Sequence, residues 1–301
     1  RAAAGSLGYY VQPLCSPTRG TIMTGRYPSH TGIGPNVIRP VSPYAMPKDE
    51  VLIPQLLKKV GYATHAVGKW HLGYCDERYS PLYRGFDSFC GYLNGAEDYW
   101  QHTRADAGFS GLDFRNGSGT DVLPPSHNSS WGVYSSVIFG QEVARIATHH
   151  GATAAKATPL FVYFPFQSVH APLQAPESYL QEYKEVNDTA RQKTCAMISA
   201  MDDAVAVALA GYKSAGLWDD TVTVFSTDNG GPLGATGDHN NYPLRSGKAH
   251  NWEGGVRGVG WVRGTNSGLA KVPAGSVTHE LMHTTDWLPT LVALAGGTFS
   301  V

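Results

Sequence analysis

The fold is organised around one stretch near the start of the chain, Pro13-Leu14-Cys15-Ser16-Pro17-Thr18-Arg19-Gly20. This stretch has the residue types of a helix N-terminus, because Ser16 can cap a helix and Pro17 suits the first helical position. The helix is expected to continue to Thr24 and to end at Gly25, since glycine is the usual residue just past a helix C-terminus.

The same stretch places a thiol near a guanidinium. Cys15, just ahead of the predicted helix, lies beside unpaired backbone N–H groups and the positive end of the helix dipole, where anions bind. Arg19 follows four residues later, on the same helical face, and carries a planar fork of donors. Two interpretations stay open from these residues alone: an anion-binding reactive thiol, or a small buried cysteine that happens to precede a helix.

Two motifs resemble those of the type I sulfatases. The first is Cys15-x-Pro17-x-Arg19 followed by Met23-Thr24-Gly25-Arg26-Tyr27, and the second is Gly61-Tyr62-Ala63-Thr64-His65-Ala66-Val67-Gly68-Lys69-Trp70-His71-Leu72-Gly73. The resemblance implies an α/β, alkaline-phosphatase-like fold. It also implies that a formylglycine-generating enzyme oxidises Cys15 to formylglycine, whose aldehyde hydrate is the nucleophile.

Composition limits the possible partners. The chain has 301 residues, is 42% hydrophobic and carries a net charge of −1, so it can bury a substantial core and has no general electrostatic attraction for nucleic acid or membranes. We find no apolar run long enough to span a bilayer, no visible signal peptide and no internal repeat. Residues 1–301 are therefore interpreted as a single catalytic domain.

Helical and extended patterns alternate along the chain. We expect strands at 62–67, 160–166, 221–226 and 256–262, and helices at 49–60, 137–149, 189–214 and 284–294. This alternation predicts a mainly parallel central sheet with helices on both faces, with ligands bound beyond the carboxyl ends of the strands. Residues 84–100 are expected to be irregular, and residues 106–130 a polar loop.

Four candidate site residues carry cationic or titratable groups. Lys69 and His71 are two residues apart after a predicted strand, so on an extended chain they point the same way. A surface pair of this kind has no function by itself, and a lone histidine such as His170 more often holds structure together. The resemblance implies instead that Lys69 and His71 clamp sulfate, and that His170 protonates the leaving group. Lys248 matches a second family lysine that holds sulfate oxygens.

A metal site is predicted at the end of the third strand. Asp228 and Asn229 offer the hard oxygen ligands that Ca²⁺ or Mg²⁺ takes, although Asp-Asn-Gly-Gly is also a common turn sequence. The resemblance implies that both residues bind the metal, which with Arg19 holds residue 15. Family members add a pair of aspartates on the first strand and a smaller C-terminal subdomain. We expect both the first strand and this subdomain to be absent from the chain.

Three sequons and four cysteines bear on location. Asn116, Asn128 and Asn187 fit the N-glycosylation pattern, which favours a secreted or lysosomal protein. We hypothesise a disulfide between Cys75 and Cys90, because both lie in loop-like sequence and close a short loop. Such a bridge would contribute ~3 kcal/mol.

Within the family, the chain is most similar to the arylsulfatase B (N-acetylgalactosamine-4-sulfatase) group over nearly its whole length. The supporting stretches are Arg84-Gly-Phe-Asp-Ser-Phe89, Gly95-Ala-Glu-Asp-Tyr-Trp100, Gln167-Ser-Val-His-Ala-Pro-Leu173, Trp252-Glu-Gly-Gly-Val-Arg-Gly258 and Asp286-Trp-Leu-Pro-Thr290. The resemblance implies a sulfuric ester hydrolase acting on sulfated sugars of the glycosaminoglycan type or on aryl sulfates. Two alternatives stay open: an inactive secreted protein that binds sulfated polysaccharide, and a phosphodiesterase or phosphonate hydrolase of the same superfamily.

Overall fold

Strand β3 (Ala63–Lys69) lies inside a four-stranded sheet with the order β7-β4-β3-β8. It pairs in parallel with β4 (Ser88–Tyr92) on one side and with β8 (Leu160–Tyr163) on the other. β7 (Phe114–Ser118) adds to β4 in the antiparallel direction. The computed structural model describes residues 4–119, 130–153, 157–234, 239–264 and 273–299.

A second four-stranded sheet has the order β11-β1-β10-β9. Its strands are β1 (Ala4–Ser6), β9 (Thr223–Ser226), β10 (Gly260–Arg263) and β11 (Val277–Thr278). β10 runs antiparallel to both of its neighbours, whereas β1 and β11 are parallel, so this sheet is mixed. Two smaller pairs complete the strands: β2 (Tyr9–Tyr10) with β12 (Met282–His283), and β5 (Thr103–Asp106) with β6 (Phe109–Leu112).

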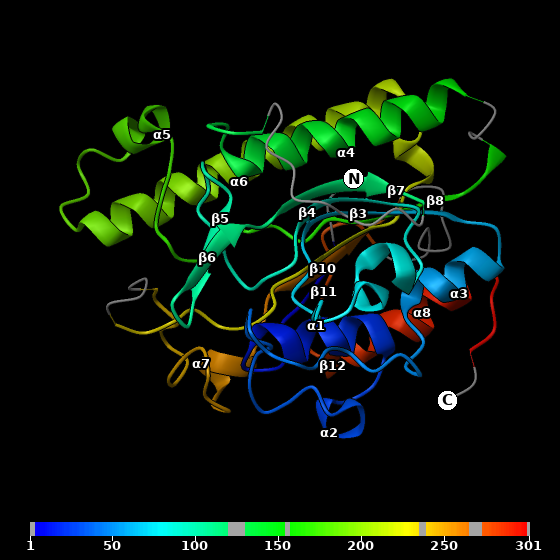
Figure 1. Ribbon diagram of the computed structural model, residues 1–301, viewed down its shortest axis with the longest axis horizontal. Helices are drawn as coiled ribbons and strands as arrows, with labels where there is room; N and C mark the ends of the chain where they lie inside the picture. The colour runs from blue at the N-terminus through cyan, green and yellow to red at the C-terminus, as the bar shows by residue number, and fades with distance from the viewer. Residues whose placement is uncertain (1–3, 120–129, 154–156, 235–238, 265–272, 300–301) are drawn as a thin grey trace.

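Helices cover both faces of the strands (Figure 1). The long helices α4 (Ser135–Ala152) and α6 (Thr189–Ser214) lie together on one face, while α1 (Cys15–Thr24), α3 (Ile53–Lys59) and α8 (Trp287–Leu294) lie on the other. Among the described residues, the other helices are α2 (Pro28–Thr31), α5 (Glu177–Glu182), α7 (Glu253–Val256) and the 3₁₀ helices η1 (Glu77–Tyr79), η2 (Pro81–Arg84), η4 (Trp218–Asp220) and η5 (Thr284–Asp286). The predicted α/β class, with helices on both faces, is confirmed.

Two apolar clusters attach the helices to the sheet. Val67 of β3 packs with Phe139 and Val143 of α4, which burial of apolar area stabilises. On the opposite face, Ile53 of α3 packs with Leu288 of α8. α6 is long and apolar enough to cross a membrane by length and composition. This differs from the expectation that no apolar run is long enough to span a bilayer. In this structure α6 lies along α4 (Figure 1), and 39% of that apolar stretch is buried.

The end of β3 approaches its neighbours very closely. Gly68 has a φ of 120°, and a Cβ there would lie 2.0 Å from the carbonyl oxygen of Pro165. A Cβ on Gly91, in β4, would lie 2.0 Å from the carbonyl oxygen of Gly68. Only glycine permits this spacing. It brings the chain on either side of Lys69 against the loop that follows β8.

The predicted disulfide is wrong. All four cysteines are free: Cys75 is exposed, and Cys90 is buried in β4 rather than in a loop. The side chain of Cys90 packs into the cluster that contains Val67 and Phe139, so its strand position points it toward the core. Burial raises the pKa of the Cys90 thiol well above its usual range.

The loops predicted at 84–100 and 106–130 are wrong in part. Residues 88–92 form β4, and β6 and β7 lie between residues 109 and 118. Glycine and polar residues obscured the strand pattern, because these strands gain their stability from pairing across the sheet. Asn116 is exposed on β7, and Asn187 is exposed between α5 and α6. Asn128 lies outside the described residues.

Candidate active site

The predicted site residues converge around the N-terminus of α1. Lys69 ends β3, His170 follows β8, and Asp228 and Asn229 follow β9. α1 begins at Cys15 itself, two residues earlier than the sequence predicted, and Gly25 caps its C-terminus with a φ of 67°. Ser16 is therefore not the cap, and its Oγ accepts a hydrogen bond from the backbone N–H of Ile38 instead (3.1 Å).

Cys15 is the centre of the arrangement. Its side chain is buried, and its Sγ lies 3.4 Å from Oδ1 of Asn229. Burial raises the pKa of the thiol, but the nearby Lys69 ammonium and a hydrogen bond with His170 outweigh it, so the pKa lies well below its usual value. The position at a helix N-terminus favours negative charge in the same sense. The site therefore stabilises an anion at residue 15.

Arg19 joins two strand ends. Its Nε and Nη2 donate to Oδ2 of Asp228 at 3.2 and 2.9 Å, and its Nη1 donates to the backbone carbonyl of Lys69 at 2.9 Å. Burial raises the pKa of Asp228, but the cations Arg19, Lys69 and Lys248 outweigh burial and hold it well below its usual range. Asp228 is therefore a carboxylate at neutral pH.

Thr18 adds a link that the sequence did not suggest. Its Oγ1 donates to the backbone carbonyl of Asp228 (2.5 Å) and accepts from the N–H of Gln12 (3.0 Å). Thr18 and Arg19 thus donate hydrogen bonds to the same aspartate, Thr18 to its backbone carbonyl and Arg19 to its side chain. The only sequence signal was the place of Thr18 inside the Cys15–Arg19 motif.

Lys69 is buried next to the thiol. Burial lowers its pKa to about 8, with the Cys15 sulfur acting in the opposite direction and Arg19 in the same direction. An ammonium with a pKa of about 8 is mostly protonated at neutral pH. The nearby Cys15 sulfur and Asp228 carboxylate favour this charged form. It can pair with an anion held over residue 15.

His71 reaches the site from a left-handed turn. Its φ is 58°, so the extended spacing predicted for Lys69 and His71 does not hold, although both side chains approach Cys15. Nε2 donates to the carbonyl of Ile38 (3.0 Å), while the buried Nδ1 has no partner among the described residues. Burial and the Lys69 charge lower the pKa of His71 to about 4. The ring is therefore neutral, with Nδ1 as an acceptor.

His170 approaches from the loop after β8. Its Nδ1 donates to the carbonyl of Ala171 (2.8 Å), which leaves Nε2 for other contacts. The ring lies within hydrogen-bonding reach of Cys15. Its backbone is tied at both ends, since its N–H donates to the carbonyl of Gln167 (3.0 Å) and its carbonyl accepts from the hydroxyl of Tyr99 (2.9 Å).

Lys248 lies on a loop that touches both the thiol loop and the Asn229 loop. Its N–H donates to the carbonyl of Gly231 (3.0 Å), and the next N–H, of Ala249, donates to the carbonyl of Pro13 (2.9 Å). Asn241 was not predicted as a site residue. Its side chain exchanges two hydrogen bonds of 2.9 Å with the backbone of Gly231, which fixes this loop.

The two residues predicted as metal ligands, Asp228 and Asn229, follow β9 and lie beside Cys15 and Arg19. Asp228 and Asn229 offer oxygen donors of the type that Ca²⁺ and Mg²⁺ take. Across the described ranges, no group of three or more His, Cys, Asp or Glu side chains is arranged to hold a metal ion. The two residues thus fit a hard cation in kind and would supply a fraction of its ligands.

Comparisons with known proteins agree with this geometry. Mouse arylsulfatase J is 42% identical over 294 residues, which are 96% of this chain and 46% of that protein. Human arylsulfatase A is 30% identical over 312 residues, 98% of this chain and 58% of that protein. The chain therefore spans about half the length of these relatives.

A solved structure and a family profile extend the comparison. The crystal structure of Ps i-CgsB in complex with k-i-k-neocarrahexaose superposes with a TM-score of 0.85 at 27% identity, covering 99% of this chain and 65% of that one. The sequence profile of the Sulfatase family matches residues 7–297. Because that match covers nearly the whole chain and the strand ends gather the motif residues around Cys15, the chain belongs to the sulfatase family.

Proposed function

We propose that this protein hydrolyses sulfate esters, with residue 15 as the nucleophile after its oxidation to formylglycine. The observation that carries the proposal is the set of cations around Cys15. Lys69 and Arg19 lie beside the thiol, Lys248 lies near Lys69, and all three cations lie near the Asp228 carboxylate. This excess of positive charge in a buried pocket suits a sulfate group. We propose in addition that residues 1–301 form one catalytic domain.

Sulfate would bind over residue 15 through side chains that are already in place. Lys69 is buried beside the sulfur, and Lys248 lies on a loop hydrogen-bonded to the loops on both sides of it. Donors fixed before the substrate arrives stabilise the charge on the transferring group without reorganising during the reaction. Arg19 holds Asp228 and the end of β3, and so maintains the frame in which these groups meet.

The two histidines are suited to opposite proton transfers. His170 has Nδ1 committed to the Ala171 carbonyl, so a protonated Nε2 can donate to the departing alcohol or phenol oxygen. His71 is neutral with a free Nδ1, so it can accept a proton from residue 15. Formylglycine supplies an aldehyde hydrate, with one hydroxyl for attack on sulfur and a second whose deprotonation expels sulfate.

We also propose that Asp228 and Asn229 hold a divalent cation, Ca²⁺ or Mg²⁺. Oxygen donors from a carboxylate and an amide suit either ion, and Asn229 Oδ1 lies 3.4 Å from Sγ of Cys15, the atom that oxygen would replace in formylglycine. When bound, the ion would add positive charge beside residue 15.

The proposed substrate is a sulfated carbohydrate, with aryl sulfates as surrogate substrates. The names of the relatives include N-acetylgalactosamine-6-sulfatase and arylsulfatase A, and the similar structure of Ps i-CgsB holds a neocarrahexaose. We propose a secretory route, because the sequons at Asn116 and Asn187 lie on exposed positions. A formylglycine-generating enzyme would act on Cys15 along that route.

The test uses the protein in its full natural length, expressed with a formylglycine-generating enzyme and supplied with Ca²⁺ or Mg²⁺. Mass spectrometry of the peptide across residue 15 measures conversion of the thiol. Sulfate release is then measured from 4-nitrophenyl sulfate and from sulfated oligosaccharides, with the phosphodiester bis(4-nitrophenyl) phosphate as the competing phosphate ester. Cys15→Ala is the matched control, because it removes the nucleophile and leaves every surrounding cation.

Sulfate release that depends on converted residue 15 supports the proposal. Preference for the phosphate ester would instead indicate a phosphodiesterase or phosphonate hydrolase. Binding of sulfated polysaccharide without sulfate release, in converted and metal-loaded protein, would identify a non-catalytic binding protein and overturn the proposal.

A further inference from the structure

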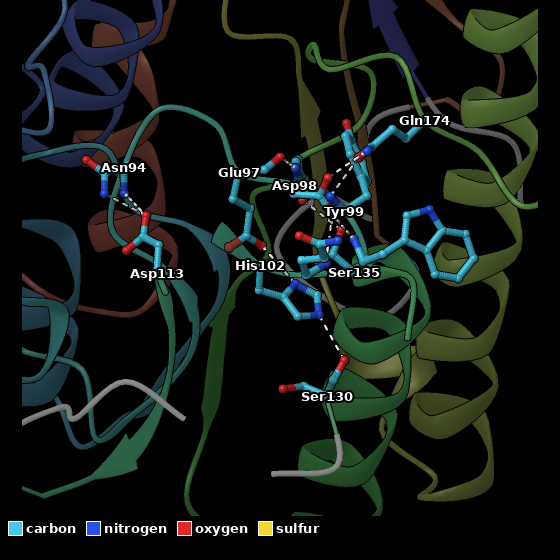
Figure 2. A network of polar contacts seen from close by, with 12 residues as sticks. Asn94, Glu97, Asp98, Tyr99, His102, Asp113, Ser130, Ser135 and Gln174 are labelled. Atoms are coloured by element: carbon cyan, nitrogen blue, oxygen red, sulfur yellow. Dashed lines mark hydrogen bonds and ion pairs between the residues drawn. The ribbon is translucent and has the colours of Figure 1, made fainter. Parts of the chain in front are cut away.

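Segment 93–102 contacts both histidines of the site, although none of its side chains takes part in the proposed chemistry. It runs from the end of β4 to the start of β5, and its Tyr99 packs against Met197 and Ala200 of α6, while Figure 2 shows its polar contacts. The carbonyl of Leu93 accepts from the N–H of His71 (3.1 Å). At Gly95 a Cβ would lie 2.5 Å from Cε1 of the His71 ring, so the segment also packs against that ring.

The other half of the segment holds the loop that carries His170. The hydroxyl of Tyr99 donates to the carbonyl of His170 (2.9 Å). The carbonyl of Glu97 accepts from Nε2 of Gln167 (2.6 Å), and the N–H of Tyr99 donates to Oε1 of Gln174 (2.9 Å). The loop is therefore bonded to the segment at its start, its middle and its end, and Figure 2 shows the Tyr99–Gln174 part of this network.

A buried ion-pair site stiffens the segment itself. Nδ1 of His102 lies 3.3 Å from Oε1 of Glu97, and both side chains are almost fully buried (Figure 2). Nε2 of His102 must donate to the carbonyl of Ser130 (2.9 Å), since a carbonyl only accepts. The contact between Nδ1 and Glu97 then requires a proton between them, from either partner. Breaking such a buried pair is costly, so the segment has one stable arrangement.

We propose that Tyr99 is a positioning residue for His170, and that segment 93–102 is the frame that sets the two histidines relative to residue 15. This inference rests on the proposed function, in which His170 protonates the leaving oxygen. Tyr99 is fully buried and stacks on Tyr134 with ring centroids 5.1 Å apart, so its hydroxyl has little freedom to move. Because the hydroxyl bonds the backbone of His170 itself, it controls where the ring lies.

A general acid matters in proportion to the basicity of the leaving group. An acidic phenol such as 4-nitrophenol leaves readily without a proton, whereas a sugar alcohol requires one. A displaced His170 should therefore slow the hydrolysis of sugar sulfates and leave that of 4-nitrophenyl sulfate nearly unchanged. A general loss of structure in the site would slow both substrates alike.

The test compares Tyr99→Phe with the matched control Tyr134→Phe in converted, metal-loaded protein. Tyr134 belongs to the same stack, but its hydroxyl donates to the carbonyl of Gln174 (2.9 Å) rather than to that of His170. We expect Tyr99→Phe to lower kcat on a sugar sulfate roughly 10-fold with KM within about twofold, since small misplacements of a reacting group have effects of this order or larger. Equal losses on both substrates, or equal effects of the two variants, would overturn the inference.

Two further measurements keep the test decisive. If Tyr99 acts through His170, adding Tyr99→Phe to His170→Ala produces no further loss on the sugar sulfate. Additive losses would contradict the inference. If Tyr99→Phe fails to fold, Gln174→Met replaces it, because that change removes two bonds to the segment from a half-buried side chain.

The result that would overturn the proposed function differs from the result that would overturn the role of Tyr99. Converted wild-type protein that releases no sulfate from either ester overturns the proposed function. Hydrogen exchange of peptides covering residues 167–174 then decides the positioning role without activity. Exchange that is at least ~10-fold faster in Tyr99→Phe than in Tyr134→Phe supports it, and equal exchange overturns it.

Discussion

Arg19 donates two hydrogen bonds to a single carboxylate oxygen of Asp228, from Nη2 at 2.9 Å and from Nε at 3.2 Å. The Arg19 side chain is 7% exposed and that of Asp228 27% exposed, so water screens this pair little. A third bond reaches the carbonyl of Lys69, which ends β3. One side chain of α1 thus ties together the strand ends that carry the cationic and the carboxylate parts of the site.

Arg19→Ala should lower the free energy of unfolding by ~3 kcal/mol, because it leaves the partly buried Asp228 carboxylate without its hydrogen-bonded partner. Arg26→Ala is the control: Arg26 pairs with Glu50 at 3.2 Å, but its side chain is 43% exposed. That loss should be below ~1 kcal/mol. Urea unfolding of both variants measures the difference, and equal losses would contradict the importance of the buried pair.

Lys69 predicts a pH dependence of anion binding. Its pKa is lowered to about 8, and only the protonated ammonium attracts sulfate. As pH rises through 8, the lysine loses its charge, so the inhibition constant of inorganic sulfate should rise ~10-fold per pH unit above that value. Lys69→Met should bind sulfate weakly at every pH and show no such rise. A wild-type inhibition constant that stays flat from pH 7 to about pH 9.5 would be inconsistent with a charge change at Lys69.

Gly95→Ala should impair catalysis without unfolding the protein. The new Cβ would lie 2.5 Å from Cε1 of His71, so the ring must move away from residue 15. We expect kcat/KM to fall ~100-fold. Gly111→Ala is the control, because no atom lies within 4 Å of a Cβ at that position in β6. If both variants keep wild-type kcat/KM, catalysis does not require the observed position of the His71 ring.

Cys75 and Cys90, the two cysteines of the predicted disulfide, should differ in reactivity. Cys75 is exposed and Cys90 is buried with a raised pKa. Iodoacetamide should therefore label Cys75 in the native protein and Cys90 only after unfolding. Peptide mapping without reductant checks this directly, and a Cys75–Cys90 cross-linked peptide would refute the free-thiol arrangement.

Local sequence patterns predicted the long elements well. α6 runs over the expected residues 189–214, because its apolar stripe repeats at helical spacing over many turns. They failed for β4 to β7, where glycine and polar residues hide the alternation. β4 and β7 are stabilised by partners distant in sequence, as in the register of Cys90 with Asn116, so a local window could not identify them. β5 and β6 pair locally, across a two-residue turn between Asp106 and Phe109.

The site shows the same division. The residue types and motif spacing around Cys15 and Lys69 were enough to place the chain in its family and to name the groups that meet. The sequence did not reveal the left-handed turn at His71 or the hydrogen bond from Thr18 to the carbonyl of Asp228. It also did not reveal the hydrogen bond from Tyr99 to the carbonyl of His170.

The sequence by itself determined the helix that carries the thiol, the order of the main strands and helices, and the chemical groups at the strand ends. Those properties follow from side-chain periodicity and residue type, which act over a few residues. Only the tertiary structure decided which ring nitrogens are free, which cysteines are buried and which carboxylate Arg19 holds. These depend on burial and on distances between residues as far apart as Arg19 and Asp228, and local periodicity carries no information about either.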